Sequence, residues 1–356
     1  MRLKTMKAID DILNGVIKEG SLAGASYAIV HVSGYMEIKT LGYFQTHPKK
    51  IKNKSSVIYD VASLTKVIST TTMIMSLIEG GRLSLKSKIK DILDRFIHPE
   101  ITIYHLMTHT SGLPADIPRA KTLKSKDEVL DKVFSAPLIS PVGETIVYSD
   151  IGYILLGLII EKITGRSLDE VSQELIFKPL GMKHTGYHPK ASTCAPTEYR
   201  NDDVYQGYLQ GLVHDEKAFA MGGEAGHAGL FSTTKDIARF MLAILRKEFV
   251  LSNHTLDMLF MAQEKRVLPN ENVLIRALGW DKPTMMSSAG SMVSFDDTIL
   301  HTGFTGCNMF MDRKAGVGFV LLSNDVHPSR ETKSILKLRH EIANLVMSKR
   351  EEYDEK

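Results

Sequence analysis

Residues 58–81 read IYDVASLTKVISTTTMIMSLIEGG, and this stretch combines a strand pattern, a serine–lysine pair and a helix pattern. Strand-forming and small residues come first, and a long apolar run then predicts a helix that ends at Gly80 and Gly81. Ser63 and Lys66 open that helix three positions apart, so their side chains share one face. A serine hydroxyl needs a nearby base, and a desolvated lysine can supply it. Ser63 is therefore a candidate nucleophile and Lys66 its candidate base.

The same serine–lysine spacing recurs three more times, so the tetrapeptide alone is a weak signal. The other pairs lie among Lys, Arg and Glu residues, as is typical of a solvated helix face: Ser87/Lys90, Ser232/Lys235 and Ser334/Lys337. Only Ser63 follows a strand pattern and opens a helix, and the first turn of a helix offers backbone amides without intrahelical partners. Such amides can stabilise an oxyanion. The context therefore favours Ser63 over the other three serines.

Two further motifs follow in chain order, Tyr-Ser-Asp at 148–150 and His-Thr-Gly at 301–303. An S-x-x-K motif followed by S-D-N and K-T-G is the signature of penicillin-binding proteins and serine β-lactamases. The tyrosine variant, within YSDIGYILLG at 148–157, resembles the branch that holds class C β-lactamases, D-alanyl-D-alanine carboxypeptidases and related esterases. Three further stretches extend this resemblance over about residues 20 to 325: LMTHTSGLP (106–114), KPLGM (178–182) and GHAGLFST (226–233).

The resemblance implies a serine hydrolase that works through an acyl-enzyme. Ser63 would attack the substrate carbonyl, Lys66 would take its proton, and Tyr148 would protonate the leaving group and activate the deacylating water. As in the family, the third motif would line one edge of the site, and the amides of Ser63 and Phe304 would form the oxyanion hole. The candidate substrate-binding residues are Asp150, His301, Thr302, Gly303, Phe304 and His227.

The protonation states of these groups decide their roles. Lys66 acts as a base only if desolvation lowers its pKa. The Tyr148 phenol has an ordinary pKa of about 10, which an adjacent ammonium would lower. Asp150 stands where asparagine is more usual, and an ionised Asp150 near Lys66 would raise the lysine pKa and strengthen the case for Tyr148. The alternatives are a protonated Asp150 or a solvent-facing helix cap.

Two histidines carry open questions. His301 stands where many penicillin-recognising relatives carry lysine, and histidine is mostly neutral at about pH 7.5. Recognition of a substrate carboxylate, which β-lactams and D-alanyl peptides both carry, is therefore in question. His227 lies in the glycine-rich segment 222–229, which suggests close approach of the backbone. That segment is either a tight connection into a helix over 232–245 or a loop that turns His227 toward the cleft.

Strand patterns occur near both ends of the chain. Residues 26–32 and 35–38 predict a hairpin, and residues 308–311 and 317–322 predict another. Apolar residues at helical intervals predict a closing helix over 334–347. Both chain ends thus supply antiparallel strands.

Residues 85–215, between these ends, read as mostly helical. The economical architecture is α/β (α+β), with an antiparallel sheet built from both chain ends and flanked by helices. An α/β subdomain of residues 1–84 plus 216–356 would hold a mainly helical subdomain of residues 85–215, within a single catalytic domain. The site would lie in the cleft between them, and the resemblance implies the same fold.

Composition narrows the partners. The chain of 356 residues has 44 basic and 41 acidic residues, and its net charge of +3 is weak for a nucleic-acid binder. Its longest apolar stretch, 151–160, is about half of what a membrane span requires. Residues 1–11 alternate charged and apolar side chains without the apolar core of a signal peptide. We expect no nucleic-acid partner, no membrane span and, by default, a cytoplasmic location.

No pattern requires a metal or another cofactor. The pairs His105/His109 and His184/His188 are each four residues apart, but H-E-x-x-H does not occur. G-x-S-x-G is also absent from the sequence, which disfavours the α/β-hydrolase route to serine catalysis.

Three classes of function remain. The leading one is hydrolysis of a small-molecule or peptide substrate at an ester, amide or lactam carbonyl, with a D-alanyl peptide or a small ester as the expected substrate. A β-lactamase differs by rapid deacylation, which sequence does not reveal. A binding or sensor module that acylates without turnover is the third class, and the presence of Ser63, Lys66 and Tyr148 counts against it.

Overall fold

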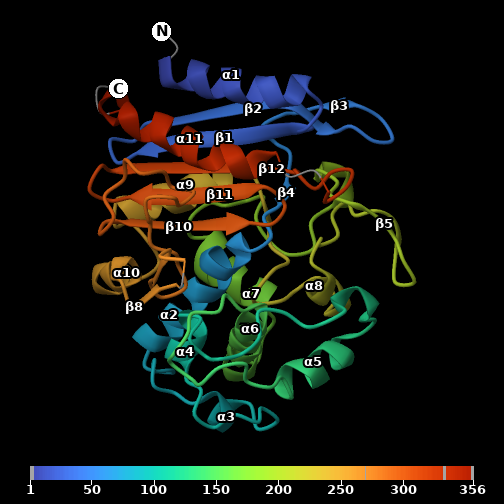
Figure 1. Cartoon of the computed structure of the whole chain (residues 1–356), viewed down its shortest axis with the longest axis vertical. Coiled ribbons are helices and arrows are strands. Elements are labelled where there is room, and N and C mark those ends of the chain that lie inside the picture. Colours follow the sequence, from blue (N-terminus) through green and yellow to red (C-terminus); the bar gives the residue numbers. More distant parts are fainter. Residues whose placement is uncertain (1–3, 269, 332–333, 354–356) are drawn as a thin grey trace.

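One central sheet joins the two ends of the chain (Figure 1). The computed structural model describes residues 4–268, 270–331 and 334–353. The strands of the sheet are β1 (Gly24–His31), β2 (Met36–Gln45), β3 (Ile51–Lys52), β10 (Thr298–Gly303), β11 (Cys307–Asp312) and β12 (Val317–Ser323). Their order is β10-β11-β12-β1-β2-β3, and every neighbouring pair is antiparallel. The predicted antiparallel sheet from both chain ends is therefore confirmed.

Strands β1, β11 and β12 are buried on both faces, which explains why they are mostly apolar, whereas β2 is largely half-buried and β3 is exposed. Successive side chains point to opposite faces, so Tyr27 and Val30 enter two different apolar clusters. On the face of Tyr27 lie α1 (Lys4–Lys18) and α11 (Ile335–Ser348), and on the face of Val30 lies α9 (Thr234–Leu245). The closing helix predicted over 334–347 corresponds to α11.

The other helices lie below the sheet in the view of Figure 1. They are α2 (Thr72–Glu79), α3 (Ile89–Ile92), α4 (Ile103–Met107), α5 (Lys126–Phe134), α6 (Asp150–Thr164), α7 (Leu168–Ser172), α8 (Glu216–Ala220) and α10 (Asn253–Phe260). Three short ladders pair β4 (Tyr59–Asp60) with β7 (Phe231–Ser232), β5 (Tyr199–Asn201) with β6 (Gln206–Tyr208), and β8 (Glu264–Val267) with β9 (Val273–Arg276).

Residues 85–215 contain less helix than the sequence predicts. Irregular segments connect short helices, and two of these segments cover 108–119 and 135–149. Pro137 and Pro141 lie in the second segment, where their missing N–H groups oppose helix formation. This irregular segment ends at the residue pair Tyr148 and Ser149, so it delivers the second motif to the start of α6.

The amino-terminal segment is amphipathic, as its pattern indicates. Residues 1–3 lie outside the described residues, and residues 4–11 belong to α1. Met6, Ile9 and Leu13 are buried in the apolar cluster shared with the sheet. Among the residues that the structure describes, no helix is both long and apolar enough to cross a membrane.

Candidate active site

A sharp turn presents Ser63 between strand β4 and the helix that follows. The carboxylate of Asp60 accepts hydrogen bonds from the backbone N–H of Ala62 at 2.8 Å and of His214 at 2.7 Å. Ala62 adopts a left-handed backbone conformation with φ of 47°. This conformation is uncommon for a residue with a Cβ, and the Asp60 contacts hold it in place. The predicted strand-to-helix setting of Ser63 is confirmed.

Lys66 lies beneath Ser63 and is fully buried. Its Nζ donates to Ser63 Oγ at 3.0 Å and to the backbone oxygen of His227 at 3.1 Å, and it pairs with Asp150 Oδ1 at 2.8 Å. Lys66 begins a π-helical stretch over Lys66–Thr71 that continues as α2. The predicted serine–lysine contact is therefore present, and a carboxylate completes it.

Tyr148 reaches the same point from the start of α6. Ser149 caps that helix by accepting from the N–H of Gly152, and its own N–H donates to His109 Nδ1 at 3.0 Å. The His109 ring packs against the Tyr148 ring with centroids 4.7 Å apart. Lys66 Nζ lies 4.8 Å from the centroid of the Tyr148 ring. The first two motifs thus meet in the structure, although Lys66 and Tyr148 are 82 residues apart in sequence.

The third motif approaches from the edge strand β10. A Cβ at Gly303 would lie 2.6 Å from the backbone oxygen of Val61, so glycine is what allows this strand to lie against the nucleophile turn. Thr305 fixes the connection by donating to the backbone oxygen of Asp60 at 2.8 Å. The Phe304 side chain is half exposed and stacks on His214, with ring centroids 5.5 Å apart.

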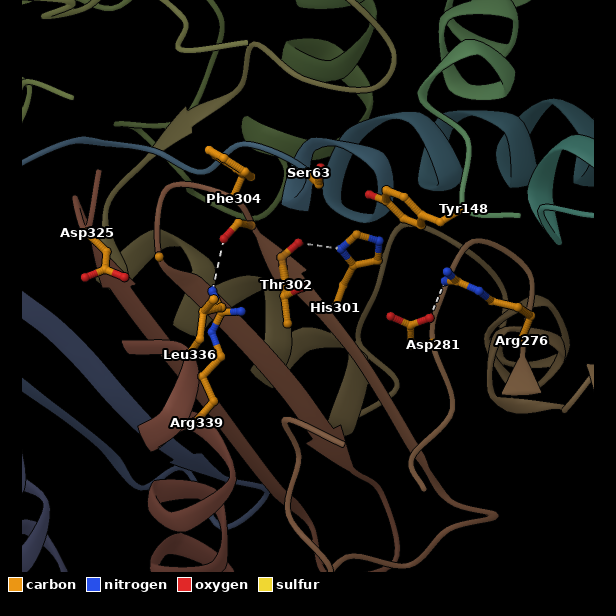
Figure 2. A pocket seen from close by; sticks show the side chains of 12 residues that line it. Ser63, Tyr148, Arg276, Asp281, His301, Thr302, Phe304, Asp325, Leu336 and Arg339 are labelled. Atoms are coloured by element: carbon orange, nitrogen blue, oxygen red, sulfur yellow. Dashed lines mark hydrogen bonds and ion pairs between the residues drawn. The ribbon is translucent and has the colours of Figure 1, made fainter. Parts of the chain in front are cut away.

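Two cavities meet at this point, and Ser63, Tyr148 and Phe304 line both. The first, which we call the β10 cavity, has a volume of about 420 Å³ (Figure 2). Its other lining residues are Arg276, Asp281, His301, Thr302, Gly303, Gly306, Asp325, Leu336 and Arg339. The second, which we call the α8 cavity, has a volume of about 220 Å³. Its other lining residues are Ala62, Asp116, Asp150, His214, Asp215, Glu216, Lys217, Ala228 and Arg330.

Lys66 retains its proton in this environment. Burial alone would lower the pKa of the Lys66 ammonium, but the charge of Asp150 and hydrogen bonds with Asp150 and Tyr148 raise it above its ordinary value. Burial would raise the pKa of Asp150, but Lys66, His227 and Lys217 hold it below its ordinary value. Asp150 is therefore ionised, and Ser149 is the residue that caps α6. The protonated and capping alternatives for Asp150 are wrong.

The Tyr148 phenol also retains its proton. Burial raises its pKa by more than the Lys66 charge and the hydrogen bonds with Lys66 and Ser63 lower it. The ammonium thus lowers the pKa of Tyr148 as expected, but burial outweighs it and the net shift is upward. The pattern placed the cation correctly but did not reveal how completely the surrounding side chains exclude water from the phenol.

His301 does not replace the missing lysine charge. Its side chain is buried, and burial together with the charges of Lys66 and Arg276 lowers its pKa to about 3. Arg276, which the sequence analysis missed, points into the β10 cavity and pairs with Asp281 (Figure 2). Its guanidinium carbon lies 5.3 Å from the centroid of the Tyr148 ring. An arginine on a short surface ladder 25 residues before the motif gave no sequence signal.

His227 is buried and is absent from the described linings of both cavities. Its Nε2 contacts Asp215 Oδ1 at 2.7 Å, while its carbonyl accepts from Lys66. The predicted close approach is real, because a Cβ at Gly226 would lie 2.1 Å from the backbone oxygen of Tyr153. The tight-connection alternative, with the following helix capped by Thr233, fits this segment better than a cleft-facing His227.

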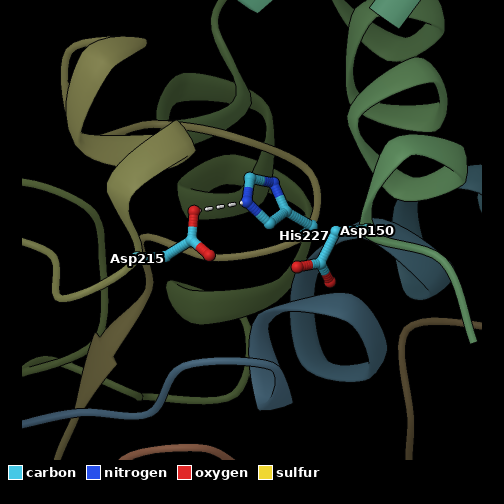
Figure 3. Close-up of side chains that lie close together, drawn as sticks. All are labelled: Asp150, Asp215 and His227. Atoms are coloured by element: carbon cyan, nitrogen blue, oxygen red, sulfur yellow. Dashed lines mark hydrogen bonds and ion pairs between the residues drawn. The ribbon is translucent and has the colours of Figure 1, made fainter. Parts of the chain in front are cut away.

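One group of side chains among the described residues has the geometry of a metal site. Asp150, Asp215 and His227 bring ligand atoms within 4.8 Å of one another (Figure 3). The ammonium groups of Lys66 and Lys217 contact the same carboxylates, at 2.8 to 3.2 Å. The negative charge that would attract a metal ion is thus already paired, and we assign no ion to this group.

Comparisons with known proteins agree with the motifs. A model of the Beta-lactamase family matches residues 9–344. The chain belongs to the beta-lactamase family. It is 30% identical to an N-acetylmuramyl-L-alanine amidase of Bacillus subtilis (strain 168), over 91% of this chain and 82% of the relative. It is 32% identical to a protein of Escherichia coli (strain K12) named as a candidate D-alanyl-D-alanine carboxypeptidase, over 78% of this chain and 71% of the relative.

Solved structures share the fold of this chain at low identity. A penicillin-binding protein homologue from Pyrococcus abyssi superposes with a TM-score of 0.78 at 20% identity, covering 98% of this chain and 79% of that one. The hydrolase EstCE1 has a TM-score of 0.78 at 19% identity and covers 96% and 98% of the two chains. A class C beta-lactamase has a TM-score of 0.75 at 18% identity and covers 97% and 96%. The protein therefore has the β-lactamase/transpeptidase-like fold and belongs to a family of hydrolases.

Proposed function

We propose that this protein is a serine hydrolase that forms an acyl-enzyme on Ser63 and cleaves amide bonds of small, carboxylate-bearing peptide substrates. The observation that carries the proposal is the contact of Lys66 Nζ with Ser63 Oγ at 3.0 Å, with Tyr148 beside both at the junction of two cavities. A nucleophile with a positioned proton acceptor in a cleft is the minimum that acyl transfer requires.

In this proposal Tyr148, not Lys66, is the proton acceptor. Asp150 keeps Lys66 as an ammonium, and that ammonium stabilises the phenolate once Tyr148 has lost its proton to solvent. Ser63 Oγ bonds to the carbonyl carbon as its proton passes to the phenolate. The resulting phenol then gives that proton to the leaving nitrogen as the C–N bond breaks.

Deacylation reverses these roles with water in place of the amine. Tyr148 takes a proton from the water that attacks the ester carbon, and the proton returns to Ser63 Oγ as the acyl–oxygen bond breaks. The amides of Ser63 and Phe304 are the proposed donors to the oxyanion in both steps. Only the fraction of enzyme with ionised Tyr148 reacts, so the rate of acylation rises with pH.

The substrate class is inferred from the relatives and from the β10 cavity. The two relatives named above are an amidase and a candidate carboxypeptidase, and both names refer to amide bonds of alanyl compounds. Arg276 supplies the cation that His301 does not, and a guanidinium has five N–H donors, which leaves capacity for a substrate carboxylate beside Asp281.

Product analysis by liquid chromatography and mass spectrometry tests this proposal. The substrates are N-acetylmuramyl-L-alanine, an N-acylated peptide ending in D-Ala-D-Ala, and a cephalosporin, each with wild-type enzyme and Ser63→Ala. We expect wild-type enzyme to release alanine from at least one of the two amides and Ser63→Ala to release none. Faster turnover of the cephalosporin would favour the β-lactamase alternative, and a stable adduct without release would favour the sensor module.

A further inference from the structure

Helix α8 carries a buried cation that the proposed mechanism does not use. The Lys217 side chain is 1% exposed, and its Nζ contacts three carboxylates. The distances are 2.8 Å to Asp116 Oδ1, 2.9 Å to Asp215 Oδ2 and 3.2 Å to Asp150 Oδ2. Burying a charge costs several kcal/mol unless it is paired. Three carboxylates around one buried ammonium therefore form a specific ion-pair arrangement. Lys217 belongs to none of the sequence motifs described above.

These contacts belong to a closed ring that passes through the catalytic lysine. Asp150 bridges Lys66 through one oxygen and Lys217 through the other. Asp215 bridges Lys217 and His227 in the same way, and Figure 3 shows its contact with His227. The carbonyl of His227 accepts a hydrogen bond from Lys66. Among the described residues, Lys66 and Lys217 are the two cations at ion-pair distance from Asp150.

The consequence is that Asp150 divides its charge between two ammonium groups. Burial alone would lower the pKa of Lys217, but its carboxylate partners raise it, so Lys217 stays charged throughout the neutral range. Without Lys217, the full attraction of Asp150 would fall on Lys66, and a nearby repulsive charge would also be lost. Both effects favour retention of the proton that acylation must release.

We propose that Lys217 is a positioning residue that holds Asp150 between two cations and thereby sets how readily the Ser63–Lys66–Tyr148 group gives up a proton. This inference rests on the proposed function. Lys217 touches neither Ser63 nor the attacked carbonyl in this proposal. It acts through Asp150.

Other charged groups face this ring from several elements and define the background for the test. Lys66 also influences two buried imidazoles, and Arg276 acts on the same two from the β10 side. The lining of the α8 cavity also contains the ion pair of Arg330 with Glu216, and His214. The groups concerned are Tyr148, His109, His301, Arg276, Asp116, Asp215, His227, His214, Glu216 and Arg330.

The test is the rate constant for labelling of Ser63 by a fluorophosphonate, measured from pH 5.5 to 10. This probe reports nucleophile activation without requiring the natural substrate. For Lys217→Met we expect the rising limb of the profile to move to higher pH by about one unit, which is about a tenfold slower reaction below it. For Asp116→Asn we expect a smaller shift to lower pH, because Lys217 loses a competing partner. Asp116 is 56% exposed, so this variant should fold.

Lys126→Met is the matched control, since it removes one positive charge from an ion pair with Glu161 whose lysine is 45% exposed. We expect no shift for this variant. Unmoved limbs in folded Lys217→Met and Asp116→Asn would overturn the proposal. If Lys217→Met does not fold, Asp116→Asn decides alone, and an unmoved limb there overturns it. A wild-type protein that takes no label on Ser63 would instead overturn the proposed function itself.

Discussion

The two cavities that meet at Ser63 use their cations differently. In the β10 cavity, Arg276 faces the open space, and Asp281 is its one carboxylate partner within the part of the chain that the structure describes. In the α8 cavity, Lys217 contacts three carboxylates, and one of them, Asp150, also pairs with Lys66. A lightly paired arginine can still recruit a substrate carboxylate, whereas a fully paired buried lysine serves the electrostatics of the enzyme itself. In our proposal, this difference separates substrate recognition by Arg276 from nucleophile activation through Lys217.

We expect the largest effect from a substitution of Tyr148, which is one of the residues that line both cavities. Tyr148→Phe should lower kcat/KM by at least about 100-fold for charged and neutral substrates alike, because the proposed proton acceptor is lost. The ring packing against His109 is retained, so thermal unfolding should stay close to that of the wild type. Steady-state kinetics with both substrate classes checks this. Near-normal turnover would show that Tyr148 is only structural. The contrast between the two cavities would then have no shared catalytic group.

The next effect should be confined to the β10 side. Arg276→Met should reduce kcat/KM for a substrate with a free carboxylate by about 10- to 100-fold, the range for a lost charged hydrogen bond, and spare its neutral ester. Arg313→Met is the control, since Arg313 pairs with Asp257 and Asp297 away from both cavities. Equal losses for the charged and neutral substrates would show that Arg276 does not read a carboxylate.

The pH dependence distinguishes Arg276 from His301. With its pKa at about 3, His301 is neutral from pH 5.5 to 8, while arginine is charged throughout. The ratio of kcat/KM for charged and neutral substrates should therefore stay constant over that range, although both rates rise with pH. A ratio that is larger at pH 5.5 would mean that His301 gains a proton and reads the carboxylate.

We expect the smallest effect from replacing His301, in the His-Thr-Gly motif, by another neutral side chain. His301→Gln should leave the ratio of charged to neutral substrate within about twofold of the wild type, because no charge is removed at neutral pH. A loss comparable to that of Arg276→Met would transfer carboxylate recognition from Arg276 to His301. Measuring both variants with the same substrate pair makes the contrast direct.

Much of the frame was predictable because it depends on local patterns. The strands at both chain ends, the closing helix and the turn before Ser63 follow from apolar periodicity and from the residues that bound it. The irregular path of 135–149 was not predicted, since its course is set by contacts such as that of Ser149 with His109. The division into subdomains of residues 1–84 plus 216–356 and 85–215 stays a prediction.

The site was predictable only where a motif carries it. Ser63, Lys66 and Tyr148 come together as expected, and Asp150 joins them as an ionised partner. The contacts of Lys217 could not be predicted, because its partners Asp116, Asp150 and Asp215 lie far from one another in sequence. The protonation states of these side chains could not be predicted either, because they depend on burial, which the spacing of motif residues does not indicate.

The most direct test of the central claim is to map the residue that a fluorophosphonate labels. Wild-type protein should carry the label on the peptide that contains Ser63, and Ser63→Ala should carry none. Ser87→Ala, Ser232→Ala and Ser334→Ala should label like the wild type, although they change the same residue type in the same spacing. Undiminished labelling of Ser63→Ala, or a label mapped to another residue, would contradict the account.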